Sequence, residues 1–148
     1  MAIDADAPLA ARLERIRVEA GVRMGITGSA AAPKIAVVAA PTTFTALDGV
    51  AYEEDAVDVV GRAISMGNCH RAFPLTVAMC VGVAARLEGT VVRECSTAPD
   101  DADVRLAHPS GILPLDARVG SESGRPHAER VTVYRTARRL MEGFVRVP

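Results

Sequence analysis

The stretch SMGNCHRAFPLT, residues 65–76, places a glycine, a cysteine, a histidine and an arginine directly before a long run of small apolar residues. A helix that begins near Pro74 would present the unpaired N–H groups of its first turn at this point. Such groups bind carboxylates, and a histidine, an arginine and a hydroxyl beside them add charge-assisted hydrogen bonds. The stretch therefore predicts a site for an acidic small molecule, with binding residues Gly67, Asn68, His70, Arg71 and Thr76.

A purely structural interpretation of the same residues stays open. Arg71 would then pair with a surface acid, and His70 would cap the helix or pack against it. Cys69 is ambiguous in the same way: a thiol beside a histidine near a helix start can ionise near neutral pH, whereas a lone cysteine is more often a small buried apolar residue. Cys69 and His70 are the candidates for proton transfer, and no other catalytic residue is assigned.

A second polar stretch, HPSG at residues 108–111, lies between two apolar runs. The Ser110 hydroxyl and the Gly111 N–H could meet a ligand, and His108 joins them as a binding candidate, although HPSG is also a good turn sequence. The arginines of YRTARRLMEG, Arg135, Arg138 and Arg139, are either a second carboxylate clamp or a solvated edge. Cys69, His70 and His108 have no metal-ligand spacing, so no metal site is expected. No cofactor is expected either.

Charge and composition narrow the class of protein. The chain has 148 residues, a net charge of -1 and a single lysine, Lys34, which fits one domain and argues against binding nucleic acid or a membrane surface. Three cysteines without a C-x-x-C pair indicate a reducing compartment, and the acidic N-terminus has no apolar signal segment. The longest apolar stretch is shorter than the ~18 residues that a membrane span needs. We therefore expect a cytoplasmic protein.

Hydrophobic patterning predicts the elements that would position these residues. An amphipathic helix is expected at residues 8–23, with Leu9, Leu13, Ile16 and Ala20 on its apolar face. The segment 72–86 is apolar all round, which predicts a helix surrounded by protein, with Cys80 in the core. Strands are expected at residues 34–41, 56–67, 90–95, 103–119 around a hairpin turn at HPSG, and within 130–147. The predicted class is α+β, a mostly β domain wrapped around one central apolar helix with the amphipathic helix outside.

Three stretches also carry a family likeness. RAISMGNCHRAFPLTVAMCVGVAARLEGTVV, VRLAHPSGILPLDARV and RTARRLMEGFVRVP resemble, in the right order, the second half of the methylaconitate and methylitaconate isomerase (PrpF-type) family. This family has the diaminopimelate-epimerase-like fold and includes oxalomesaconate tautomerases. Its members have two similar domains, each a β-barrel-like sheet around a central helix, with the active site in the cleft between them. The resemblance implies that residues 1–148 form one domain, the second of the two, and that the start of its central helix and the HPSG loop face the cleft.

The resemblance also implies a reaction, a 1,3-allylic proton shift in an unsaturated di- or tricarboxylate such as methylaconitate, methylitaconate or oxalomesaconate. The lysine and cysteine implicated in moving the proton belong to the first domain, which is absent here, and Lys34 is not in that motif. Pro74 stands where epimerases of this fold have a second cysteine. We therefore expect a carboxylate-binding half, completed in a homodimer or by a separately encoded first domain. The alternatives are a non-catalytic polycarboxylate-binding or regulatory domain, or a truncated remnant.

Overall fold

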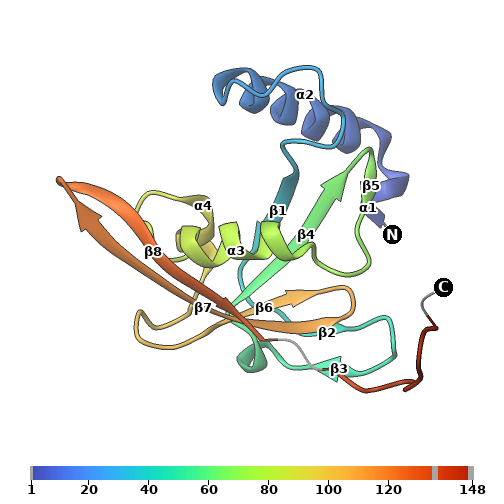
Figure 1. Ribbon diagram of the computed structural model, residues 1–148. Coiled ribbons are helices and arrows are strands. Elements are labelled where there is room, and N and C mark those ends of the chain that lie inside the picture. Colours follow the sequence, from blue (N-terminus) through green and yellow to red (C-terminus); the bar gives the residue numbers. More distant parts are fainter. Residues whose placement is uncertain (1, 135–136, 147–148) are drawn as a thin grey trace.

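A curled sheet with one helix on its inner face makes up most of the computed structural model, which describes residues 2–134 and 137–146 (Figure 1). The strands of the main sheet run in the order β1-β4-β6-β7-β8, with β5 paired to β4. All pairs are antiparallel except β4 with β6. A separate two-stranded sheet joins β2 to β3.

The strands are β1 (Ile35–Ala39), β2 (Phe44–Thr45), β3 (Ala51–Tyr52), β4 (Val59–Ser65), β5 (Asn68–Cys69), β6 (Val104–His108), β7 (Gly111–Glu122) and β8 (Arg125–Val133). The helices are α1 (Ala2–Ala5), α2 (Ala7–Arg23), α3 (Leu75–Ala84) and α4 (Val91–Cys95), with a 3₁₀ turn at Glu54–Ala56. None of the helices in these described stretches has the length and apolar character needed to span a bilayer.

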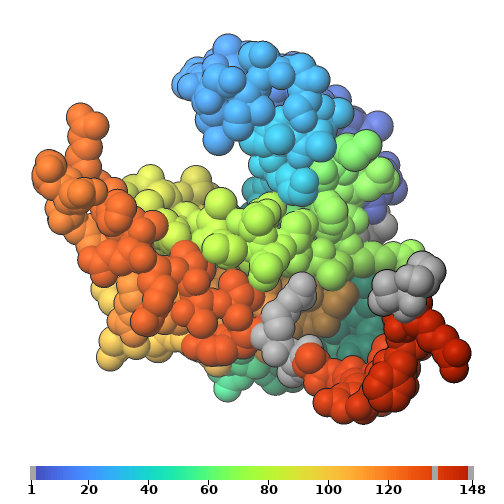
Figure 2. Space-filling model, viewed as in Figure 1, coloured from blue at the N-terminus to red at the C-terminus, as the bar shows by residue number. Residues whose placement is uncertain are grey.

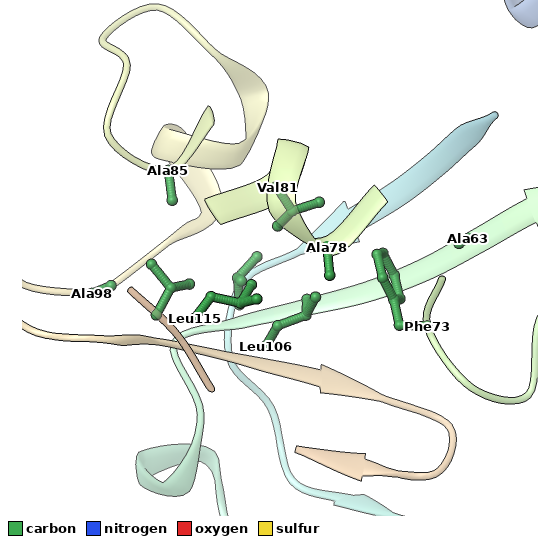
Figure 3. Packing of buried hydrophobic residues seen from close by; sticks show 10 residues of the cluster. Ala63, Phe73, Ala78, Val81, Ala85, Ala98, Leu106 and Leu115 are labelled. Atoms are coloured by element: carbon green, nitrogen blue, oxygen red, sulfur yellow. The ribbon is translucent and has the colours of Figure 1, made fainter. Parts of the chain in front are cut away.

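The main core lies between α3 and the inner face of the sheet (Figure 3). Ala78 and Val81 of α3 pack among Leu106 and Leu115 of the sheet, and small side chains let the helix approach closely. The Phe73 ring packs directly over Gly61, and it can do so only because Gly61 has no side chain: a Cβ there would lie 2.8 Å from Phe73 Cε2. Phe73 thereby fixes the chain directly before α3 against β4.

This architecture confirms the predicted α+β class and the curled sheet around an apolar helix. The expectation that the helix is surrounded by protein is wrong for the residues that the structure describes. Thr76 and Cys80 are exposed, so Cys80 does not lie in the core as predicted. The half-barrel leaves one side of α3 uncovered.

Helix α2 begins as the sequence predicts, because the Asp6 side chain accepts a hydrogen bond from the Leu9 N–H at 2.9 Å. Its buried stripe is different from the predicted one: Leu13, Arg17 and Gly21 are buried, whereas Ile16 is 49% exposed. The Arg17 guanidinium donates to the carbonyls of Ser29, Ala32 and Pro33 and pairs with Glu14. A buried arginine therefore organises the loop that follows this helix.

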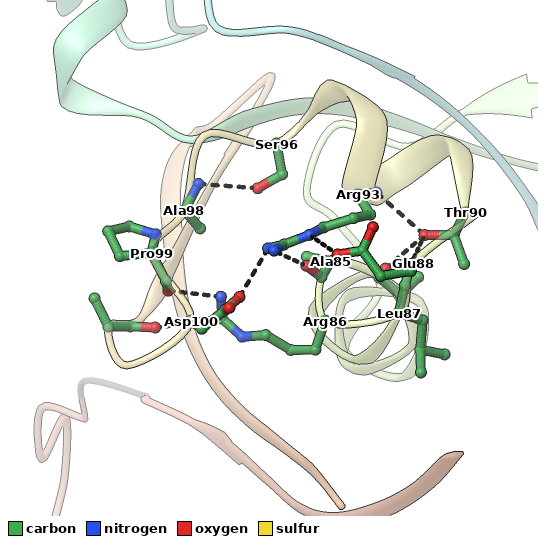
Figure 4. Close-up of polar contacts among 12 residues, drawn as sticks. Ala85, Arg86, Leu87, Glu88, Thr90, Arg93, Ser96, Ala98, Pro99 and Asp100 are labelled. Carbon is green, nitrogen blue, oxygen red and sulfur yellow. Dashed lines mark hydrogen bonds and ion pairs between the residues drawn. The ribbon is translucent and has the colours of Figure 1, made fainter. Parts of the chain in front are cut away.

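Residues 90–95, predicted as a strand, include helix α4. Thr90 accepts from the Arg93 N–H at 3.1 Å, which caps the helix, and its hydroxyl donates to the Ala84 carbonyl at 2.6 Å. Arg93 pairs with Asp100 at 2.8 Å, and Arg86 donates to carbonyls of the same loop (Figure 4). The alternating pattern of TVVREC favours a strand, but these contacts stabilise a short helix at this position instead.

The last segment is strand only as far as Val133. Residues 137–146 have no regular secondary structure, so the strand pattern at Phe144 and Val145 gave a wrong prediction, while Arg135 and Val147 lie outside the described residues. Arg139 pairs with Glu142 at 2.7 Å and both side chains are exposed, as on a solvated edge.

Candidate substrate-binding site

The HPSG turn meets the segment before α3, and we call this junction, Arg71, His108, Ser110 and Gly111, the loop site. The Ser110 hydroxyl donates to the Arg71 carbonyl at 2.7 Å, and the Ser110 N–H donates to His108 Nδ1 at 3.2 Å. The Phe73 and His108 rings lie 6.4 Å apart and are tilted. The structure thus brings together the two polar stretches that sequence analysis singled out, from positions 39 residues apart in the case of Ser110 and Arg71.

His108 is a neutral, buried member of this site. Because its Nδ1 accepts a hydrogen bond, its proton sits on Nε2. Burial lowers the pKa of His108, the positive charge of Arg62 lowers it further, and a hydrogen bond with the Arg71 backbone partly opposes both. His108 therefore holds the turn in place and supplies no positive charge at neutral pH.

The first turn of α3 supplies hydrogen-bond donors beside the loop site. Its N-cap is Pro74, whose side chain has no acceptor, and no side chain caps this end. The N–H groups of the first turn therefore remain available to an acceptor from outside the helix. Arg71 is exposed just before this turn, so an arginine and a helix start lie together as predicted.

Arg62 is a site residue that sequence reasoning missed. It is half-buried on β4, and its guanidinium donates to the Gly61 carbonyl at 2.8 Å, while no carboxylate of the described residues forms an ion pair with it. Burial lowers the pKa of Arg62, and its charge acts on both Cys69 and His108. It adds a positive charge beside the loop site. The sequence signal was an arginine interrupting an otherwise apolar strand.

Tyr52 is a second missed neighbour of the loop site. Gly111 has φ +122, and its Cβ, if it had one, would lie 3.5 Å from the Tyr52 hydroxyl. The Tyr52 ring stacks on Phe44 at 5.1 Å, and the Leu47 N–H donates to the Pro109 carbonyl at 2.8 Å. The β2–β3 hairpin therefore supports the HPSG turn and brings a phenol to its glycine.

Gly67 and Asn68 are not part of this assembly. They belong to the turn between β4 and β5, where Met66 has φ 53 and Gly67 φ 78, and Asn68 Nδ2 donates to the Met66 carbonyl. The ladder then continues to His70, whose N–H donates to the Ala63 carbonyl. About 10 Å of extended chain therefore separates Gly67 from His70.

Thr76 is also directed away from the loop site. It is exposed on α3 and lines a groove that faces Ile16 and Met24 of the α2 region. Because Ala78 and Val81 face the core, the helical period places Thr76 on the opposite side of α3. Only the start of the helix, and not the Thr76 hydroxyl, adjoins Arg71.

Cys69 is buried among Leu13 and Ile64, and its N–H donates to Asp4 Oδ1 at 2.7 Å. Burial raises the pKa of the Cys69 thiol, and the Asp4 charge raises it further, against a smaller effect of Arg62. The thiol therefore stays protonated at neutral pH and fits the small apolar alternative. His70 follows Cys69 in the chain and is half-buried.

The described residues contain no group of three or more histidine, cysteine, aspartate or glutamate side chains placed to hold a metal ion. The arrangement offers hydrogen-bond donors and positive charge from Arg62, Arg71 and the start of α3. It can bind a carboxylate and stabilise negative charge.

The PrpF protein family model matches residues 1–148, and the chain belongs to this family. It is 38% identical over 153 residues to a 2-methyl-aconitate isomerase of Shewanella oneidensis, covering 99% of this chain and 38% of the relative. It is 36% identical over 155 residues to a 3-methylitaconate isomerase of Eubacterium barkeri, covering 98% of this chain and 40% of the relative. The chain thus spans about two fifths of the length of these relatives.

The fold agrees with this assignment. A crystal structure of a methylitaconate-delta-isomerase superimposes with a TM-score of 0.81 and 33% identity, over 97% of this chain and 39% of that one. The family resemblance stated from the three sequence stretches is confirmed.

Proposed function

We propose that this chain is the carboxylate-binding half of an isomerase that moves a double bond in an unsaturated di- or tricarboxylate. The observation that carries the proposal is the uncapped start of α3 directly after the exposed Arg71, together with the half-buried Arg62, whose charge acts on His108 of the loop site and pairs with no carboxylate of the described residues. Relatives named for methylaconitate and methylitaconate supply the substrate class. Oxalomesaconate belongs to the same chemical class and is a further candidate.

The reaction that fits is a 1,3-allylic proton shift. A base removes a proton from the carbon next to a carboxylate, the electron pair spreads over three carbons and that carboxylate, and an acid returns a proton two carbons away. Negative charge on the carboxylate grows as the proton leaves. This larger charge would be stabilised by Arg71, Arg62 and the first-turn N–H groups of α3. These groups would stabilise it more strongly than they stabilise the charge of the bound substrate before the proton leaves.

The base and acid would come from a second polypeptide region. His108 accepts from the Ser110 N–H and hydrogen-bonds with the Arg71 backbone, and the raised pKa of Cys69 keeps its thiol protonated. We infer that residues 1–148 act as one domain, completed by a lysine- and cysteine-bearing domain or by another subunit. Without that completion the chain binds its ligand and does not turn it over.

Proton NMR of the purified chain with cis-aconitate, methylaconitate and itaconate in D2O tests this proposal. We expect ligand line broadening without deuterium incorporation or double-bond migration. Arg71→Ala should weaken binding about ten-fold, the loss of one charge-assisted contact of ~1.4 kcal/mol. Arg12→Ala, an exposed arginine of α2, is the matched control and should leave affinity unchanged. Equal affinity of both variants and the parent chain would remove Arg71 from the site.

A non-catalytic, regulatory binding domain is the second candidate function. The neutral His108 and the protonated Cys69 favour it, because binding needs no base. Deuterium exchange that appears when a lysine-bearing first domain is added would reject this candidate. If adding such a domain neither changes carboxylate binding nor produces deuterium exchange, the result would favour the regulatory binding domain.

A further inference from the structure

The Tyr52 hydroxyl faces an open space at the loop site. The position that a Cβ of Gly111 would occupy has one described heavy atom within 4 Å apart from those of its chain neighbours, and that atom is the Tyr52 hydroxyl oxygen at 3.5 Å. Tyr52 is half-buried, and its hydroxyl has no hydrogen-bond partner within residues 2–134 and 137–146. A phenol, which both donates and accepts hydrogen bonds, is therefore available to a ligand at this place.

Packing holds the Tyr52 ring in one orientation. The ring stacks on Phe44 with the ring centroids 5.1 Å apart and an interplanar angle of 17°. Phe44 packs in turn against a cluster of buried residues that includes Val60 of β4. Figures 1 and 2 show the teal β2–β3 region next to the turn between β6 and β7, below the light-green α3. Because the ring is already held, a ligand that binds the hydroxyl has little side-chain entropy to remove.

The phenol lies close to the part of the loop site that carries positive charge. Gly111 follows Ser110 in the turn, and the Ser110 hydroxyl donates to the Arg71 carbonyl at 2.7 Å. The Tyr52 hydroxyl and the Arg71 backbone are therefore separated by the width of this one turn. A small ligand with several carboxylates can meet both side chains at once.

The acidic side chain next to Tyr52 in the sequence does not occupy this space. Glu53 has extended backbone with φ −78° and ψ 161°, so its side chain and that of Tyr52 point to opposite faces. The Glu53 carboxylate accepts a hydrogen bond from the Thr43 hydroxyl at 3.1 Å. A negatively charged group can therefore approach the phenol without meeting the carboxylate of Glu53.

The candidate substrates differ in their number of carboxylates. Methylaconitate has three and methylitaconate has two, and the chain is 38% and 36% identical to the relatives named for these compounds. Overall identity therefore does not select between the two classes. A hydrogen bond from a phenol to a carboxylate is charge-assisted, so a phenol placed beside an arginine suits the ligand with the additional carboxylate.

We propose that Tyr52 is a specificity-determining residue that binds the additional carboxylate of a tricarboxylate, so that this chain favours tricarboxylates over dicarboxylates. The inference rests on the proposed function, in which Arg71 and the start of α3 hold the carboxylate next to the reacting carbon. The Tyr52 hydroxyl donates to a second carboxylate in the space that the missing side chain of Gly111 leaves open. A dicarboxylate leaves this hydroxyl to water and gains nothing from it.

Titration calorimetry with cis-aconitate and itaconate tests the inference, because itaconate has a hydrogen where cis-aconitate has its third carboxylate. Tyr52→Phe keeps the ring that stacks on Phe44 and removes only the hydroxyl. We expect this variant to bind cis-aconitate about ten-fold more weakly and itaconate with less than about a two-fold change. Tyr134→Phe is the matched control, since it removes the other phenol of the chain, which donates to Asp103 Oδ1 at 3.4 Å, and it should leave both affinities unchanged.

Fluorine NMR adds a readout that a purely structural role of the phenol would not move. The chain has two tyrosines, so incorporation of fluorotyrosine gives two signals, which the Tyr52→Phe variant assigns. Saturating cis-aconitate should shift the Tyr52 signal and leave that of Tyr134 in place. Itaconate at saturation should shift the Tyr52 signal less. A phenol that only supports the turn would give the same Tyr52 signal with both acids.

The outcomes separate this inference from the proposed function. Equal weakening of both acids by Tyr52→Phe, or no weakening of either, would overturn the specificity role while the carboxylate site itself stands. A parent chain that binds itaconate as tightly as cis-aconitate would overturn it too. Binding of neither acid by the parent chain would reject both proposals.

Discussion

Gly61 gives the sharpest test of how the fold holds the loop site, because an added methyl group has no room there. A Cβ at this position would lie 2.8 Å from Phe73 Cε2 and 2.9 Å from Leu106 Cδ1. Leu106 is fully buried and Phe73 is buried, so neither side chain can turn into solvent. Overpacking of this kind costs about 1–3 kcal/mol, and the lower backbone entropy of an unfolded chain with alanine returns about 0.4–1 kcal/mol.

We therefore expect Gly61→Ala to lower the free energy of unfolding by about 1–2 kcal/mol. The measurement is urea denaturation followed by circular dichroism, with Gly143→Ala as the control, because a Cβ on Gly143 meets no atom within 4 Å. Displacement of Phe73 should also shift the start of α3 and weaken carboxylate binding. A Gly61→Ala chain as stable as the parent would refute the packing argument, and a further Phe73→Leu change should recover part of any loss.

The remaining predictions concern the titratable groups. Because the folded pKa of His108 lies below its usual value of about 6.5, the unfolded chain binds more protons just below that pH. Stability should fall as the pH drops through 6.5 toward the folded pKa, and His108→Gln should flatten this part of a denaturation-against-pH curve; an unchanged slope would contradict the burial argument. Cys69→Ser should cost about 1–2 kcal/mol, since it buries a hydroxyl, and should leave carboxylate affinity within two-fold by titration calorimetry; loss of binding would place the thiol in the site. The buried Asp58 accepts three hydrogen bonds from Arg105, so Asp58→Ala should cost about 2–3 kcal/mol in chemical denaturation, against no change for the exposed Asp101→Ala. Equal stability of these two variants would mean that the ion pair contributes nothing.

The sequence predicted correctly those helix ends and turns whose conformation depends on residues close together in the chain. The amphipathic helix expected at residues 8–23 is α2, capped by Asp6, and the HPSG turn joins β6 to β7. Glycine with positive φ marks the turns at Gly67 and Gly111. Each of these features depends on contacts within a few residues, which a single sequence displays.

Packing between distant segments decided the features that the sequence misplaced. Arg17 is buried because three carbonyls of residues 29–33 surround its guanidinium, and periodicity had given its place on the helix to Ile16. Residues 90–95 begin a helix because the Thr90 hydroxyl reaches back to the end of α3. The carbonyls that surround Arg17 and those that accept from the Thr90 hydroxyl cannot be identified from composition or residue spacing.

The sequence by itself determined the α+β class, the apolar helix within a sheet, the family, and the two polar stretches that meet at the loop site. Only the tertiary structure decided which candidates meet there: Arg71, His108 and Ser110 come together, Arg62 and Tyr52 join them, and Gly67, Asn68 and Thr76 lie elsewhere. The physical reason is the direction in which each side chain points. A residue's type and spacing fix what its side chain can do, whereas the strand register and the rotation of α3 fix which way that side chain points.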